Sequence, residues 1–325
     1  MPTQRPTFKP WLLAATLAFA AAAAPAAEFP DKPVKIVVAY PPGGATDIIA
    51  RLLGKQLSAQ WNQQVIVENK PGATGMVGAE QVVRAAPDGY TLLLGFAPEV
   101  ALNKLVFKSM TYDPLADLKP LSLVATAPLV LVVGPKLPVA SLKELAERKK
   151  SNEPLTFGTP GIGGQQHIAG ELLGRALGTP VSQIPYQGTG PALTDLLGGQ
   201  TDFFFATTPP LLQHIKAGKI KPLAVAGPAR EQLLPDVPTM VELGYPKIQV
   251  MNWFGLFAPK GLPAPLAERI AADTAKALAE PSVAQALKAQ GLTPAPLQGA
   301  ALNDFLGSEM NKYTAFIAET GIKTN

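Results

Sequence analysis

The 325-residue chain contains no cysteine, which excludes disulfides, thiolate metal sites, iron–sulfur clusters and cysteine catalysis. It has only two histidines, His167 and His214, which leaves little material for a zinc site or a Ser-His-Asp triad. Charged residues make up only 16%, the net charge is +4 and there is no basic run, so nucleic acid is not an expected partner. With 47% hydrophobic residues, the composition is that of a folded globular protein.

The first 27 residues have the pattern of a secretory signal peptide. Arg5 and Lys9 precede an apolar stretch from Trp11 to Ala24, and small residues at Ala24–Ala27 offer a cleavage site. The apolar stretch is shorter than the roughly 20 residues that a membrane-spanning helix needs. We therefore expect export to the periplasm, where pools of ATP or NAD are absent, and we expect no cofactor.

The rest of the chain alternates strands with helices. The first set predicts strands at Val34–Ala39, Val65–Val67 and Leu92–Leu94, separated by two amphipathic helices, the first with Thr46 as its N-cap. This order predicts parallel pairing with right-handed crossovers.

A second set of strands and helices follows, and the chain ends mostly in helices. Strands are expected at these places: Leu121–Ala125, Leu129–Val133, Leu155–Phe157, Gln183–Pro185, Asp202–Phe205, Pro222–Val225 and Val250–Ala258. We predict an α/β protein of two lobes with a ligand cleft between them. Residues 28–125 and 250–325 would form lobe 1, and residues 126–249 lobe 2.

Three strand-to-helix turns are rich in glycine: Tyr40–Asp47, Asn69–Gly75 and Gly158–His167. Glycine lets the backbone approach a ligand closely, and the free N–H groups of a helix N-terminus favour an anion. These turns are either ordinary tight turns or parts of an anion site. They lack the Gly-Lys-Ser/Thr ending of a phosphate loop and the dinucleotide-binding glycine spacing.

Several long blocks, in order, resemble the Bug family, the periplasmic solute-binding receptors of tripartite tricarboxylate transporters. The blocks are Tyr40–Arg51, Val67–Ala73, Ala85–Leu92, Gly158–Gly170, Pro185–Gly188, Pro191–Gln200 and Leu234–Thr239. The resemblance covers nearly the whole chain after the signal peptide. It implies a fold similar to type II periplasmic binding proteins and capture of a small organic carboxylate, largely through main-chain groups at Pro42–Asp47 and Thr159–Gly164.

The candidate ligand-binding residues come from the glycine-rich loops and their neighbours. They are Tyr40, Pro42, Gly43, Gly44, Ala45, Asp47, Phe96, Glu99, Thr159, Gly161, Ile162, Gly163, Gly164, His167, Tyr186 and Asp202. Four of them have structural alternatives. Asp47 suits the first turn of a helix, His167 a structural hydrogen bond, Tyr186 a lobe core and Asp202 the start of a strand.

Phe96 and Glu99 depart from the small or hydroxyl residues usual in the family after the third strand. Either Glu99 starts a short helix and Phe96 packs inside, or both face the cleft. In the second case the carboxylates of Asp47 and Glu99 would both lie near the cleft and would repel an anion. The ligand should then carry a hydrogen-bond donor, such as an ammonium, an amide or a protonated ring nitrogen. That hypothesis favours amino, amide or aromatic acids over citrate.

These observations predict a monomeric periplasmic receptor that passes a small carboxylate to the membrane components of a tripartite tricarboxylate transporter. Two alternatives remain open: a receptor that feeds a membrane sensor kinase, and a periplasmic hydrolase or isomerase. No nucleophile elbow, cysteine or metal cluster supports the hydrolase or isomerase, so we do not expect an enzyme.

Overall fold

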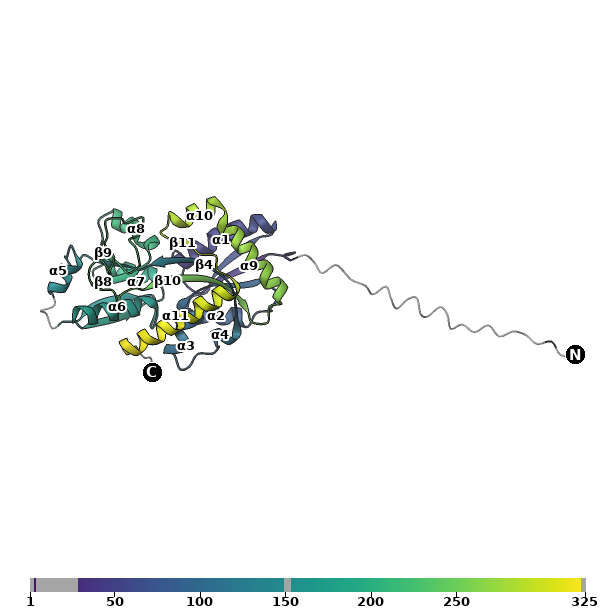
Figure 1. Cartoon of the computed structure of the whole chain (residues 1–325), viewed down its shortest axis with the longest axis horizontal. Coiled ribbons are helices and arrows are strands. Elements are labelled where there is room, and N and C mark those ends of the chain that lie inside the picture. Colours follow the sequence, from purple (N-terminus) through teal and green to yellow (C-terminus); the bar gives the residue numbers. More distant parts are fainter. Residues whose placement is uncertain (1–2, 4–28, 149–152, 323–325) are drawn as a thin grey trace. The chain divides into compact units, whose positions relative to one another are not determined.

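Two β-sheets with helices packed against them make up the fold, as a computed structural model shows (Figure 1). The structure describes residues 3, 29–148 and 153–322. The predicted signal peptide, apart from Thr3, therefore lies outside the described residues. Residues 32–325 belong to one structural unit, and everything below concerns that unit.

The first sheet has six strands in the order β11-β4-β10-β3-β1-β2. Its strands are β1 (Val34–Val38), β2 (Val65–Asn69), β3 (Thr91–Phe96), β4 (Leu118–Pro128), β10 (Met251–Pro259) and β11 (Thr293–Pro294). Strand β1 pairs in parallel with β2 and with β3, which confirms the parallel arrangement expected from the alternating pattern. Strand β10 is antiparallel to both β3 and β4, so the long β4–β10 pair lies in the middle of the sheet.

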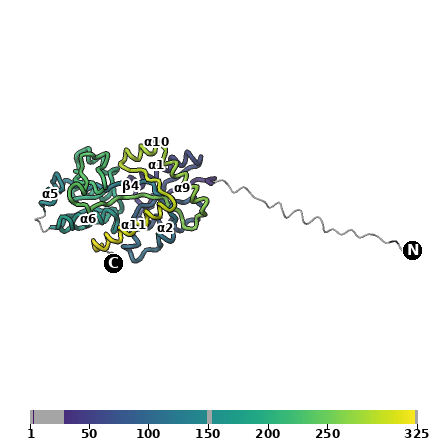
Figure 2. The backbone as a smooth tube through the Cα atoms, in the orientation of Figure 1, coloured from purple at the N-terminus to yellow at the C-terminus, as the bar shows by residue number. Residues whose placement is uncertain are grey.

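The second sheet has five strands in the order β7-β6-β8-β5-β9. Its strands are β5 (Val130–Val133), β6 (Leu155–Thr159), β7 (Val181–Pro185), β8 (Phe203–Ala206) and β9 (Lys221–Val225). Strand β6 is parallel to β7 and β8, whereas β5 is antiparallel to β8 and β9. Figure 2 shows the teal and green middle of the chain gathered apart from its purple beginning, while the yellow C-terminal helix reaches beneath the teal part.

The helices contact the strands of both sheets. They are α1 (Ala45–Trp61), α2 (Met76–Val83), α3 (Asn103–Val106), α4 (Pro114–Asp117), α5 (Leu142–Glu147), α6 (Gln165–Leu177), α7 (Thr189–Leu197), α8 (Thr208–Lys216), α9 (Ala264–Ala279), α10 (Pro281–Lys288) and α11 (Gly299–Thr320). In the part of the chain that the structure describes, no helix is long and apolar enough to cross a membrane. Helix α11 contacts β4 and also α6, so it links the two sheets (Figure 1).

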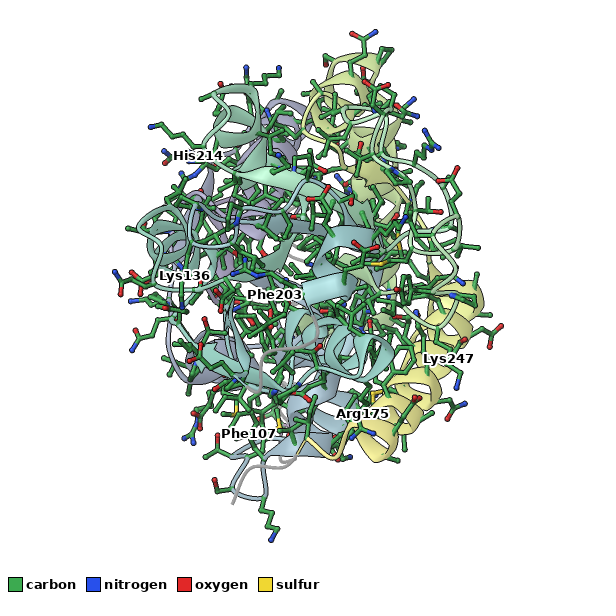
Figure 3. All side chains as sticks on the ribbon, turned by 90° about the vertical axis from the view of Figure 1, so that its left-hand side faces the viewer. Phe107, Lys136, Arg175, Phe203, His214 and Lys247 are labelled. Carbon is green, nitrogen blue, oxygen red and sulfur yellow. The ribbon has the colours of Figure 1, made fainter. Side chains whose placement is uncertain are left out.

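The interior of the second sheet is aromatic. Phe203, Phe204 and Phe205 are all fully buried, although successive side chains of a strand point to opposite faces. Both faces of β8 are therefore covered, with α6 and α7 among the helices in contact with it. Phe203 stacks on Phe157 with ring centroids 5.0 Å apart. Figure 3 shows Phe203 inside the molecule and Lys136 at the surface of the molecule.

Some sequence predictions need correction. Gly44, not Thr46, is the N-cap of α1, and Thr46 lies buried within the helix. The chain after β3 forms a π-helical turn, η2 (Pro98–Leu102), that leads directly into α3. The chain passes from the first sheet to the second between β4 and β5 and returns between β9 and β10. The residue-level lobe boundaries at 125/126 and 249/250 remain a prediction.

Candidate functional site

Two adjoining cavities lie where the loops of the two sheets meet. The large cavity has a volume of about 270 Å³ and is bounded by residues 39–41, 71–76 and Phe107 on one side and by residues 160–162 and 185–187 on the other. The small cavity has a volume of about 30 Å³. Tyr40, Pro41 and Pro160 line both cavities, so the two are neighbours with a common wall.

The N-terminal ends of four helices line the small cavity. Ala45 and Thr46 come from α1, Gln166 from α6, Thr189 and Gly190 from α7, and Thr207 is the N-cap of α8. As the structure describes them, none of the four helices has a side chain that caps its first turn. Unoccupied N–H groups at helix N-termini carry partial positive charge, so this cavity favours an anion.

Two buried amide side chains add unused hydrogen-bonding capacity to the small cavity. Gln166 is 4% exposed and Asn252 is 3% exposed, and the side-chain oxygen of each has no hydrogen-bond partner within the described residues. A buried polar group without a partner is unfavourable by about 1–3 kcal/mol. Because an amide oxygen accepts, each of the two can pair only with an N–H or O–H donor in the cavity, such as a hydroxyl group or a water molecule that accompanies an anion.

Asp47 lies beneath the first loop, away from the cavity walls. Its carboxylate accepts hydrogen bonds from the Gly43 N–H (3.1 Å), from Asn69 Nδ2 (3.1 Å) and from Arg51, whose Nη2 lies 2.9 Å away. Burial alone would raise the pKa of Asp47, but these bonds outweigh it and hold the pKa below its usual value. Asp47 therefore holds Gly43 in its left-handed conformation (φ 91°) and shapes the loop.

Glu99 is fully buried behind Tyr40 and does not line either cavity. Tyr40 Oη donates to Glu99 Oε2 (2.9 Å), the Phe96 N–H donates to Oε1 (2.8 Å), and Tyr112 Oη donates to the Glu99 main-chain oxygen (2.6 Å). Burial raises the pKa of Glu99 to about 8, although the hydrogen bonds from Phe96 and Tyr40 act in the opposite direction. The sequence left open whether Phe96 and Glu99 face the cleft. Of the two, only Phe96 reaches a cavity wall, in the small cavity.

The matching loop of the second sheet is held by its own side chains. Thr159 Oγ1 donates to the Gly161 carbonyl (2.6 Å), and the Gly163 N–H donates to His167 Nδ1 (3.0 Å). His167 is buried and lies outside both cavity linings. Gly161 and Ile162 line the large cavity, whereas Gly163 and Gly164 do not. The structure thus gives His167 the role of holding the loop.

The loops of the two sheets touch each other at glycines. A Cβ atom on Gly161 would lie 2.5 Å from Thr74 Cγ2, and one on Gly163 would lie 2.6 Å from Val106 Cγ2. Gly163 also has a φ of 75°, which side chains rarely adopt. Close approach of the loops therefore depends on the absence of side chains at these two positions.

Tyr186 and Asp202 have different placements. Tyr186 lines the large cavity, and its hydroxyl donates to Asp195 Oδ2 (2.7 Å). The structure does not bring Asp202 to either cavity. Its carboxylate accepts from the Thr156 N–H and hydroxyl (both 2.7 Å), because it precedes β8, at the ends of the parallel strands opposite to the loops.

Sequence reasoning missed several residues that line the cavities. Outside the three glycine-rich turns they are Ala39, Met76, Phe107, Pro185, Gln187, Thr189, Gly190, Thr207, Asn252 and Phe254. Pro191 and Pro209, close to the starts of α7 and α8, were the available signals for two of these positions, since proline favours the first turn of a helix. In the described ranges, no cluster of three or more His, Asp or Glu side chains is arranged to hold a metal ion.

Comparison with known proteins gives consistent findings. Residues 49–322 match the tripartite tricarboxylate transporter family receptor, TctC. The chain is 37% identical to protein BugT of Bordetella pertussis over 311 residues, which cover 94% of this chain and 95% of that protein. The solved structure of the periplasmic binding protein BugD superposes with a TM-score of 0.84 at 35% identity, covering 91% of this chain and 100% of that one. MatC from Rhodopseudomonas palustris with bound malate superposes with a TM-score of 0.82 at 31% identity, covering 89% of this chain and 100% of that one.

Proposed function

Since this chain belongs to the receptor family of tripartite tricarboxylate transporters, we propose that it captures a small organic carboxylate between its two sheets. The Bug-family resemblance and the two-lobed α/β fold expected from the sequence are confirmed by the relatives and by the structural neighbours. The receptor would act in the periplasm as a monomer and pass its ligand to the membrane components of a transporter. BugD is a periplasmic binding protein, which supports this location.

The convergence of four uncapped helix N-termini on the small cavity carries the proposal. Its volume of about 30 Å³ suits a single small group, and the donors around it suit a carboxylate. MatC, a structural neighbour, binds malate, which is also a small organic carboxylate. Of the candidate residues, we propose that Tyr40, Pro42, Gly44, Ala45, Phe96, Gly161, Ile162 and Tyr186 contact the ligand. Gly43, Asp47, Glu99, Thr159, Gly163, Gly164 and His167 would support them from behind.

A thermal-shift screen of purified protein against carboxylic acids tests the proposal. A true ligand should raise the melting temperature, and the rise should continue with the logarithm of ligand concentration above the Kd. Mass spectrometry should find the ligand chemically unchanged, as expected of a receptor rather than an enzyme. If no acid in a broad panel stabilises the protein, or if the acid is converted to another compound, the proposal is wrong.

A matched pair of glycine variants links binding to the small cavity. Gly44 lines the small cavity, and its φ of −79° is one that other residues adopt readily. No heavy atom lies within 4 Å of the position that a Cβ atom would occupy. Gly44→Val should therefore fold and fill the cavity. Gly307 of α11 is equally open but lies outside both cavities, so Gly307→Val is the control. The first variant should lose carboxylate binding and the second should retain it.

A further inference from the structure

The walls of the large cavity carry no charged side chain among the described residues. The small cavity shares this property, because Asp, Glu, Lys, Arg and His are absent from both linings in that part of the chain. Met76, Phe107 and Ile162 are apolar side chains in the large cavity, and prolines 41, 71, 160 and 185 add further apolar surface. No cation is therefore in place there to compensate a negatively charged group on a ligand.

Two tyrosines on opposite sides of the large cavity have their hydroxyl groups bound to carboxyl groups outside it. Tyr40 Oη lies 2.9 Å from Glu99 Oε2, and Tyr186 Oη lies 2.7 Å from Asp195 Oδ2. Neither Glu99 nor Asp195 lines a cavity. Because each hydroxyl is already paired, these tyrosines offer mainly their rings to an occupant, and a ring favours an apolar or aromatic body.

The helix that begins at the large cavity also differs from the four at the small one. Around the start of α2, the Gly75 N–H donates to the Gly72 carbonyl (3.0 Å), the Met76 N–H to the Ala73 carbonyl, and the Val77 N–H to the Gly72 carbonyl (3.4 Å). The carbonyls of the preceding turn therefore already occupy donors that an anion would otherwise use. The four helix starts at the small cavity therefore offer free N–H groups that the start of α2 does not, and the side-chain donors of the large cavity, Thr74 and Gln187, are neutral.

We infer that the ligand is a monocarboxylate with an uncharged, largely apolar body, and that the large cavity selects against a second carboxylate. This inference rests on the proposed function, because the single carboxylate is placed in the small cavity. A second carboxylate would lose part of its hydration in the large cavity and gain no cation and no helix N-terminus in return, only neutral donors such as Thr74 and Gln187. An aromatic or branched body fits the ring faces and apolar side chains around it.

Two matched pairs of acids test the inference by calorimetry at pH 7.5. Hexanoate and adipate have the same number of carbons, and adipate adds a second carboxylate. 3-Phenylpropanoate and phenylsuccinate form the second pair, which differs by a carboxylate near the ring. We expect each monocarboxylate to bind at least about tenfold tighter than its partner, a difference of about 1.4 kcal/mol. Equal or tighter binding of adipate or phenylsuccinate would overturn the inference while leaving the proposed function intact. If none of the four acids binds and the broader panel also fails, the proposed function itself is wrong.

A cation placed in the large cavity should reverse the preference. Met76 lines that cavity and is partly exposed, so Met76→Lys can fold with its amine at the wall. This variant should shift the hexanoate-to-adipate affinity ratio at least about tenfold towards adipate, whereas Met76→Leu should keep the wild-type ratio. An unchanged ratio in a folded Met76→Lys protein would show that the body of the ligand lies elsewhere. If Met76→Lys does not fold, the two acid pairs on the wild-type protein still decide the matter.

Discussion

Asp47 and Glu99 are two buried carboxyl groups that follow strands of the same sheet, and their pKa values are shifted in opposite directions. Each lies in the first turn of a helical segment, Asp47 after β1 and Glu99 after β3. Their exposures are similar, 5% and 0%. Nevertheless the pKa of Asp47 lies below its usual value, while burial raises that of Glu99 to about 8.

The partners of the two groups explain the difference. Asp47 has Arg51 as an ion-pair partner in addition to donors from Gly43 and Asn69. The donors to the Glu99 carboxyl group are all neutral: the N–H groups of Phe96 and of Glu99 itself, and the Tyr40 hydroxyl. Burial disfavours a charge unless a partner compensates it. Consequently, at neutral pH Asp47 is charged and paired, and Glu99 is mostly protonated. Neither group lines a cavity or presents a free negative charge to one, so the repulsion considered from the sequence does not arise in the two cavities.

The largest expected effect is the pH dependence of stability that Glu99 produces. Its folded-state pKa is raised, so its contribution to stability is fully present below the unfolded value of 4.5 and is lost as the pH rises through about 8. The loss is at most on the order of 4 kcal/mol. Urea unfolding at pH 5 and pH 8.5 should show this decline in the wild type and not in Glu99→Gln. The surface variant Glu268→Gln is the control and should follow the wild type. A wild-type decline that persists in Glu99→Gln would mean that Glu99 ionises normally.

Asp47 should show the opposite dependence and a smaller effect. Its folded-state pKa is lowered, so its stabilisation is present above the ordinary value of 3.8 and is lost as the pH falls through the lower folded-state value. Asp47→Ala should lower the free energy of unfolding at pH 7 by about 2–3 kcal/mol, because three donors lose a charged acceptor. Arg51→Gln should cost less than about 1 kcal/mol, since the Arg51 side chain is half exposed. Equal stability of Asp47→Ala and wild type in urea unfolding at pH 7 would contradict this assignment.

The sequence predicted the fold well because its signals are local. Ile36–Val38 and Phe203–Ala206 are continuous apolar runs, and both lie in strands whose side chains are buried on both faces. The Ser-x-x-Glu pattern of Ser141 and Glu144 is another local signal, since Ser141 is the N-cap of α5 and its Oγ accepts from the Glu144 N–H (3.1 Å). Thr46 failed as an N-cap because Gly44 takes that position, two residues earlier.

The candidate site was less predictable because its geometry comes from contacts between distant segments. Thr189, Thr207 and Asn252 meet at the small cavity from three separate elements, and no local pattern brings them together. The protonation of Glu99 likewise depends on burial by Tyr40, 59 positions away in the chain. Sequence spacing predicted the three glycine-rich turns that contribute to the cavity linings, but it did not predict which of their side chains face the cavities.

Tyr40→Phe isolates the hydrogen bond between Tyr40 and Glu99. It removes the hydroxyl that donates to Glu99 but keeps the ring that lines both cavities. We expect a loss of about 1 kcal/mol in the free energy of unfolding and a further rise in the pKa of Glu99, because that hydrogen bond lowers it. Urea unfolding across pH 5–9 measures both quantities. An unchanged midpoint of the pH-dependent stability change would show that the hydroxyl does not influence Glu99.

The smallest expected effect is that of Glu99 on ligand specificity. It depends on whether the Glu99 carboxyl group lines the cleft or lies behind Tyr40. If Glu99 lined the cleft, Glu99→Gln would weaken acids that bear an ammonium and would spare or improve citrate. Since Glu99 lies behind Tyr40 and outside both cavities, we expect the affinity ratio of phenylalanine to citrate to change by less than about twofold, or about 0.4 kcal/mol. Calorimetry on the wild type and on Glu99→Gln at pH 7.5 measures this ratio. A selective loss of phenylalanine binding in the variant would show that the Glu99 carboxyl group reaches the ligand, and the protonated, enclosed Glu99 described above would then apply only to the ligand-free protein.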